Sequence, residues 1–173
     1  KKAESYEICF VPDNDYRGFL RRRVDGLDEK VAGGHFVDAG GKILGRHEGY
    51  PFYTVGQRKG LGIALGEPMF VTEIRPDSNT VVLGREEDLI RNHMMVGKLS
   101  LMKYAALPEG GLEAVTKVRY RDNGTFSTLH PVGNDAEVVF HANVKGIAPG
   151  QSAVFYEGDD VVGGGIIQGS FLG

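Results

Sequence analysis

The sequence predicts a mainly β protein, in which a small β-rich region with one helix is followed by a β-barrel. Three observations support this fold class. From residue 69 onward, short stretches with strand character alternate with turn residues. The 26 glycines among 173 residues are abundant, and many fall where tight connections are expected. Only one segment near the start has the apolar periodicity of a helix.

The predicted helix begins after Pro12-Asp13, where Asp13 is a suitable N-cap. Its apolar side chains recur at i, i+3, i+4 and i+8: Tyr16, Phe19, Leu20 and Val24. Three arginines follow at its C-terminal end, where cations suit the helix dipole.

The rest of the first region reads as strands and loops. His35–Asp38 and Lys42–Gly45 flank Gly40-Gly41, which predicts a hairpin because glycine tolerates the positive φ of a tight turn. Phe52–Val55 is another predicted strand. A glycine-rich loop follows, and Pro68 ends this region.

We place the boundary between two domains near residue 69, so that residues 1–68 form the first and residues 69–173 the barrel. Glu86–Ile90 is expected to form one helical turn. Gly163–Gly165 predicts a bulge or a close backbone approach in the last strand. The predicted strands of the second domain cover residues 70–74, 80–83, 97–104, 113–121, 125–130, 135–141, 152–156 and 161–168.

Composition excludes several classes of protein. The chain has 41% apolar residues and no apolar run near the roughly 20 residues of a membrane span. Its single cysteine forms no internal disulfide, which fits a reducing compartment. The net charge of −3 argues against a strongly basic nucleic-acid binder, although a local basic face is enough to bind phosphates. The histidines are scattered without metal-ligand spacing, so we expect no metal site.

Cys9 is the first candidate catalytic residue. Between Ile8 and Phe10, a lone cysteine is by default a small buried apolar residue. A functional role requires its thiolate, which is the nucleophile and sulfur carrier. The residues alone leave both interpretations open.

Two groups of polar and cationic residues are candidates for phosphate binding. The first lies in a glycine-bounded loop: Gln57, Arg58 and Lys59. The second alternates along one predicted strand and so shares one face: Lys117, Arg119 and Arg121. In both cases the alternative is a merely solvated surface.

Ordered motifs over nearly the whole chain resemble the bacterial tRNA-uridine 2-sulfurtransferase (tRNA 2-thiouridylase) family. The resemblance is to the central and C-terminal domains of that family. Three residues depart from the family pattern: Ala148, which precedes Pro-Gly-Gln, and Tyr6 and Glu7, which precede the cysteine. The matching segments are residues 8–13, 34–38, 45–49, 52–62, 119–121, 149–156 and 163–167.

The resemblance implies ATP-dependent 2-thiolation of the wobble uridine, position 34, of tRNA in the cytoplasm. The residue matching Cys9 would carry sulfur as a persulfide, delivered by a cysteine desulfurase or a sulfur relay. A second cysteine, in an ATP-binding domain, would release the sulfur or close a disulfide with it. The barrel would resemble the second domain of translation elongation factors, with Arg119, Tyr120 and Gln151 as tRNA contacts.

No Ser-Gly-Gly-x-Asp-Ser pyrophosphatase loop occurs in the sequence. The chain is therefore expected to lack the ATP site and to be inactive alone. Two alternatives stay open: a stand-alone RNA-binding β-barrel module in which Cys9 is structural, and a β-rich protein-interaction domain. Salt-dependent tRNA binding would distinguish the protein-interaction domain from the thiouridylase and from the RNA-binding module. A persulfide on Cys9 would distinguish the thiouridylase from the RNA-binding module.

Overall fold

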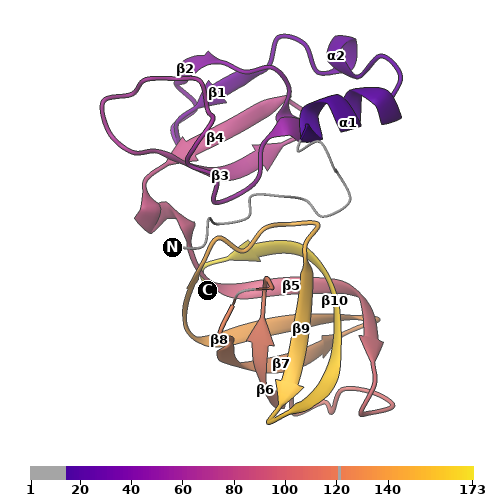
Figure 1. The fold of residues 1–173 in the computed structure, drawn as a ribbon. Helices are drawn as coiled ribbons and strands as arrows, with labels where there is room; N and C mark the ends of the chain where they lie inside the picture. Colours follow the sequence, from indigo (N-terminus) through magenta and orange to yellow (C-terminus); the bar gives the residue numbers. More distant parts are fainter. Residues whose placement is uncertain (1–14, 121) are drawn as a thin grey trace, which may run out of the picture.

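The computed structural model describes residues 15–120 and 122–173. It contains a four-stranded sheet with two short helices, followed by a closed six-stranded barrel (Figure 1). The predicted mainly β fold class is confirmed. Among the described residues, no helix has the length and apolar character needed to cross a membrane.

The first helix, α1, covers Tyr16–Arg23. Its N-cap is Asp15, whose Oδ1 accepts a hydrogen bond from the backbone N–H of Gly18 at 2.8 Å. The predicted cap, Asp13, lies outside the described residues. A second helix that we did not predict, α2, covers Leu27–Lys30, a single turn too short to show periodicity.

The small sheet has the strand order β2-β1-β4-β3. Its first two strands, β1 (His35–Val37) and β2 (Ile43–Arg46), form the predicted hairpin. The other two, β3 (Phe70–Arg75) and β4 (Thr80–Gly84), form a second antiparallel pair. Parallel pairing of β1 with β4 joins the two hairpins.

The partners of β3 and β4 differ from our expectation. We assigned both strands to the barrel, but they belong to the small sheet through β4 and β1. Alternation of side chains identifies a strand without identifying its partner. The chain leaves the sheet through the 3-10 turn η2 (Glu86–Leu89), which confirms the predicted helical turn. We therefore propose that the boundary lies near η2, not at residue 69.

The predicted strand at Phe52–Val55 is wrong. A 3-10 turn, η1, covers Tyr50–Phe52, with Pro51 near its start, and the chain then continues without regular structure. Two turn hydrogen bonds fix this segment, from Phe52 N–H to the carbonyl of Gly49 and from Tyr53 N–H to that of Tyr50, each 3.2 Å long. Proline favours such a turn because its φ is fixed near the helical value.

The barrel closes in the strand order β10-β5-β8-β7-β6-β9. All its adjacent pairs are antiparallel. Its strands are β5 (Ile90–Leu101), β6 (Leu112–Lys117), β7 (Thr125–Val132), β8 (Asp135–Lys145), β9 (Ser152–Glu157) and β10 (Asp160–Phe171).

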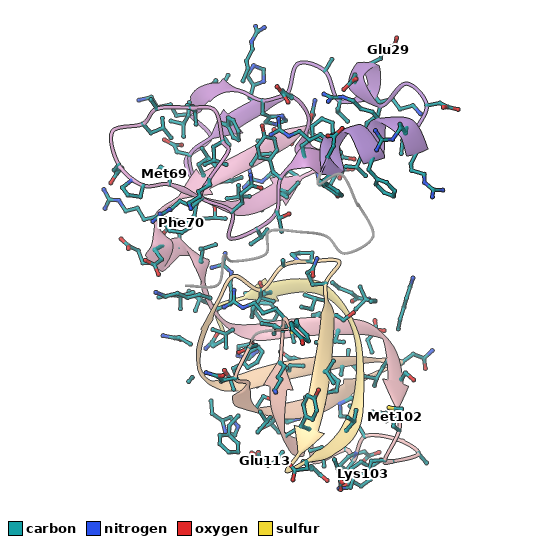
Figure 2. All side chains as sticks on the ribbon, in the orientation of Figure 1. Glu29, Met69, Phe70, Met102, Lys103 and Glu113 are labelled. Carbon is teal, nitrogen blue, oxygen red and sulfur yellow. The ribbon has the colours of Figure 1, made fainter. Side chains whose placement is uncertain are left out.

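The sheet and the barrel have separate hydrophobic cores. Phe36 and Leu83 are fully buried in the first, and Leu129 and Phe155 in the second. The two parts lie one above the other, joined through η2 (Figure 1). Met102, Lys103 and Glu113 lie at the end of the barrel far from the sheet, which we call the distal end (Figure 2).

The predicted close backbone approach in β10 is confirmed. A Cβ atom built on Gly163 would lie 2.4 Å from the carbonyl oxygen of Ser100, and one on Gly165 would lie 2.5 Å from that of Gly97. The pairing with β5 also shifts register between Gly164 and Ile166. Any side chain here would push two strands apart.

His47 is a buried titratable group of the sheet domain. Its ring packs between Phe36 and Tyr53, with centroids 5.2 and 5.5 Å away. Its Nδ1 accepts a hydrogen bond from Gly49 N–H at 3.0 Å, while Nε2 has no hydrogen-bond partner within the described chain. Burial lowers the pKa of His47 below its ordinary value, and the backbone of Asn79 offsets part of that effect.

We expect the stability of the chain to fall as the pH is lowered from about 7 to about 5. An unfolded histidine gains a proton near pH 6.5, whereas buried His47 resists protonation. Its contribution is therefore fully present above the unfolded pKa and is lost as the pH falls through the lower folded pKa. The free energy of unfolding in urea, measured across this range, should depend less on pH in His47→Gln.

A control on the other domain is His130→Gln, because His130 lies on β7 of the barrel and forms no ion pair with another described residue. This variant should keep the pH dependence of the unmodified chain. If His47→Gln kept the same pH dependence, burial of this imidazole would not be its source.

Candidate nucleic-acid interface between sheet and barrel

The turn after β6 presents Arg119 and Tyr120 to solvent. Strand β6 ends at Lys117, before the predicted end at Arg121, because the carboxylate of Asp122 holds a tight turn. Its two oxygens accept hydrogen bonds from the N–H groups of Val118 and Gly124, both at 3.0 Å. Tyr120 is 99% exposed. Strand alternation therefore does not extend to Arg119, and Arg121 lies outside the described residues.

Lys117 lies on the strand itself, as its last residue. Its Nζ lies 5.1 Å from the ring centroid of Tyr156 on β9, a cation–π contact. This contact holds the ammonium group on the outer wall of the barrel, two residues before Arg119.

Gln151 lies in the loop between β8 and β9. Backbone hydrogen bonds fix this loop against β10: Gly150 N–H donates to the carbonyl of Ile167 at 2.8 Å, and Ile167 N–H donates to that of Gln151 at 2.8 Å. Gln151 itself is exposed. The backbone of Gln151 is thus held in place while its side-chain amide faces solvent.

Gln57 shapes the loop that carries Arg58 and Lys59. Its Oε1 accepts from Thr54 N–H at 3.1 Å, and its Nε2 donates to the carbonyl of Lys59 at 2.9 Å. The side chains of Arg58 and Lys59 are exposed. The amide of Gln57 therefore serves the loop, and the two cations are the groups that this loop offers to a ligand.

The start of the Gln57 loop and the turn that carries Arg119 both lie close to Gly146. A Cβ atom built on Gly56 would lie 3.7 Å from the Cα of Gly146, and one built on Gly146 would lie 3.7 Å from Nη1 of Arg119. The sheet domain therefore meets the barrel next to Arg119, and the Gln57 loop begins at this junction.

A cavity of about 670 Å³ lies between the sheet and the barrel. Tyr16, Tyr50 and Tyr53 line its sheet side, and Gln151 its barrel side. Burial raises the pKa of Tyr53 above its ordinary value. The tyrosines were not among our predicted site residues, because nothing in the local sequence shows that they converge.

Glu73 and Arg91 add charge to the cavity lining. Nη1 of Arg91 donates to the carbonyls of Asp88 and Ile90 at 2.8 and 2.7 Å, which fixes the guanidinium at the start of β5. Hydrogen bonds from Arg75 lower the pKa of Glu73. The cavity thus combines aromatic, amide and charged groups.

Cys9, the predicted sulfur carrier, lies outside the described residues. It precedes Tyr16 by seven residues, so an extended chain spans at most about 25 Å between them. Among the residues that the structure describes, no group of three His, Cys, Asp or Glu side chains is arranged to hold a metal ion.

Comparisons with known proteins define the class to which this fold belongs. Residues 19–85 match the family described as the tRNA methyl transferase PRC-barrel domain, and residues 91–167 match the aminomethyltransferase β-barrel domain. The two matches meet between residues 85 and 91, at η2, where the chain passes from sheet to barrel.

Curated relatives narrow this class. The tRNA-specific 2-thiouridylase MnmA of Cytophaga hutchinsonii is 63% identical over 98% of this chain and 46% of its own length. Those of Amoebophilus asiaticus and Salinibacter ruber are 61% and 47% identical, over 98% and 96% of this chain and 45% and 43% of their own lengths. The chain belongs to the tRNA-specific 2-thiouridylase family, as its central and C-terminal domains. It spans about half the length of these relatives.

Proposed function

We propose that this chain is the tRNA-docking part of an enzyme that replaces the C2 oxygen of the wobble uridine of tRNA, position 34, with sulfur. The observation that carries the proposal is the 63% identity with a tRNA-specific 2-thiouridylase over 98% of the chain. The exposed Arg119, Tyr120 and Gln151 beside the Gln57 loop support it, because exposed cations and aromatic faces suit an RNA surface.

In this proposal the full-length enzyme uses ATP to place AMP on the C2 oxygen of the uridine, releasing pyrophosphate. The terminal sulfur of a persulfide on Cys9 then attacks C2, and AMP leaves with the original oxygen. A second thiol, outside this chain, breaks the S–S bond and forms a disulfide with Cys9. A persulfide suits this step because it is a reversible cap that stores sulfur on a thiol.

The proposal assigns two partners besides ATP. tRNA is the substrate, and a cysteine desulfurase or sulfur relay protein supplies the persulfide sulfur. The cytoplasm is the proposed compartment, since a reducing environment keeps the carrier thiol free.

The tRNA interface is tested by removing its cations. We expect the triple change Lys117→Ala, Arg119→Ala and Arg121→Ala to weaken tRNA binding and to flatten its salt dependence. Each lost phosphate contact reduces the slope of log K against log salt by about 0.9. Fluorescence anisotropy of labelled tRNA at several salt concentrations measures both quantities.

Lys42→Ala is the matched control, because Lys42 is an exposed cation in the hairpin of the small sheet. It should leave the slope unchanged. If the triple variant and the unmodified chain had equal slopes of log K against log salt, these three cations would not contact the RNA.

The isolated chain should not thiolate tRNA, because the sequence has no ATP-binding loop. The chain is incubated with tRNA, ATP and a sulfur donor, and the nucleosides are then analysed by mass spectrometry. Any enzyme-dependent 2-thiouridine would contradict this expectation.

A further inference from the structure

The outer wall of the barrel carries a row of apolar and aromatic side chains that the proposed function does not use. Strand register sets Phe126 of β7 opposite Val115 of β6, and Val115 opposite Tyr156 of β9. Tyr156 in turn lies opposite Val161 of β10. For each of them, at least one adjacent residue on the same strand is buried in the barrel core, so these four residues project outward. We call them the outer row.

The outer row is continuous, and its two end residues are exposed. Phe126 is 67% exposed and Val161 is 39% exposed, while Val115 and Tyr156 between them are half-buried. Single apolar residues are common on protein surfaces, but a contiguous row across adjacent strands marks an interaction surface.

Charge differs between the two sides of the outer row. Glu113, two residues before Val115, lies at the distal end of the barrel (Figure 2), where its Oε1 accepts from Thr128 Oγ1 at 2.8 Å. Lys117, two residues after Val115, lies toward the sheet and contacts the ring of Tyr156. A ligand with negative charge is therefore favoured on the side of the row that carries Lys117.

The cationic side of the row continues into the proposed RNA interface. Two residues beyond Lys117, the chain turns and exposes Arg119 and then Tyr120. Neither Lys117 nor Arg119 forms an ion pair with any other described residue, so both are available to phosphates. Aromatic faces with cations between them suit unpaired nucleotides, whose bases stack while their phosphates are neutralised.

We infer that the outer row is a stacking platform for unpaired nucleotides of tRNA, with Phe126 and Tyr156 as the stacking faces and Lys117 as a phosphate contact. This inference rests on the proposed function and extends its RNA interface over β6, β7 and β9. Paired RNA keeps its bases inside the helix, so the platform selects loops or single-stranded ends.

The test compares the 173-residue chain with the double variant Phe126→Ser, Tyr156→Leu. Anisotropy is measured with a labelled RNA hairpin that has an unpaired loop, and with a fully paired RNA duplex. The double variant should bind the hairpin at least about ten-fold more weakly, since each base–aromatic stack is a substantial part of such affinities. In Phe126→Ser alone, duplex binding and the salt slope should stay unchanged, because this change removes no charge and keeps the contact between Lys117 and Tyr156.

Two further variants keep the test decisive. Ile43→Ser removes a side chain of similar exposure, 61%, from β2 and should bind both RNAs like the unmodified chain. Phe126→Ser alone alters only an exposed side chain and should weaken hairpin binding even if the double variant is unstable.

The outcomes separate this inference from the proposed function. Unchanged hairpin affinity in a folded variant overturns the platform and assigns the row to a protein contact. An equal loss for hairpin and duplex also overturns it, because stacking on a platform requires unpaired bases. In both cases the proposed function stands if the triple cation variant weakens tRNA binding. An unmodified chain that binds neither RNA overturns the platform, and an unmodified chain that also fails to bind tRNA overturns the proposed function.

Discussion

Replacing Cys9 by serine in the full-length protein is expected to abolish 2-thiouridine in tRNA while leaving the protein folded. Serine has nearly the same size, but its hydroxyl cannot hold a transferable sulfur atom as a thiolate does. Cys9 is the only cysteine in the 173 residues of this chain. The measurement is mass spectrometry of nucleosides from the tRNA of cells in which the variant is the sole copy of the enzyme.

Two measurements on the same variant test whether it is still folded and still binds tRNA. The variant should match the unmodified protein in thermal unfolding and in affinity for tRNA, because the proposed docking residues lie more than 100 residues further along the chain or in the Gln57 loop. If 2-thiouridine persisted, Cys9 would be a structural residue. The chain would then be an RNA-docking module whose chemistry lies elsewhere.

Much of the fold was predictable because local patterns determine it. Alternation of side chains is enough to predict a strand at residues 125–130. The structure has β7 at Thr125–Val132, where Ser127 and Leu129 point into the barrel and Phe126 points out. The glycines at 163–165 were interpretable from the sequence for the same reason: a residue without a side chain inside a strand indicates a close neighbour.

The arrangement of the strands was not predictable, because pairing depends on distant segments. Phe70–Arg75 reads equally well as a barrel strand and as a sheet strand, and its partner β4 is placed in the small sheet by β1, more than 30 residues earlier. Pro51 was a local signal that we missed: it favours the 3-10 turn at Tyr50–Phe52 over a strand.

The candidate site, too, was predictable where local sequence determines it and not where distant segments do. Its cations were identifiable by residue type, but their directions were not. The side chain of Asp122, three residues beyond Arg119, ends β6 early and removes Arg119 from the alternation that we used. The cavity tyrosines come from α1 and from the segment around η1, and only the three-dimensional fold brings them together.

The change Gly164→Ala is expected to destabilise the barrel by about 1–3 kcal/mol, the usual range for a side chain forced into a packed site. A Cβ atom at this position would lie 2.5 Å from the carbonyl oxygen of Ala153 on β9. That oxygen belongs to the backbone of barrel strand β9, so relief requires β9 and β10 to separate. Because these strands help to close the barrel, their separation weakens the hydrogen bonds of the whole ring. Urea unfolding followed by circular dichroism measures the loss.

Gly169→Ala is the matched control for this prediction, because it makes the same change on the same strand. A Cβ atom on Gly169 would meet nothing within 4 Å. This variant should therefore lie within about 0.5 kcal/mol of the unmodified chain, as ordinary surface substitutions do. Equal stability of the two variants would mean that β9 and β10 adjust to a methyl group without cost, and that the close approach at Gly164 does not limit the closure of the barrel.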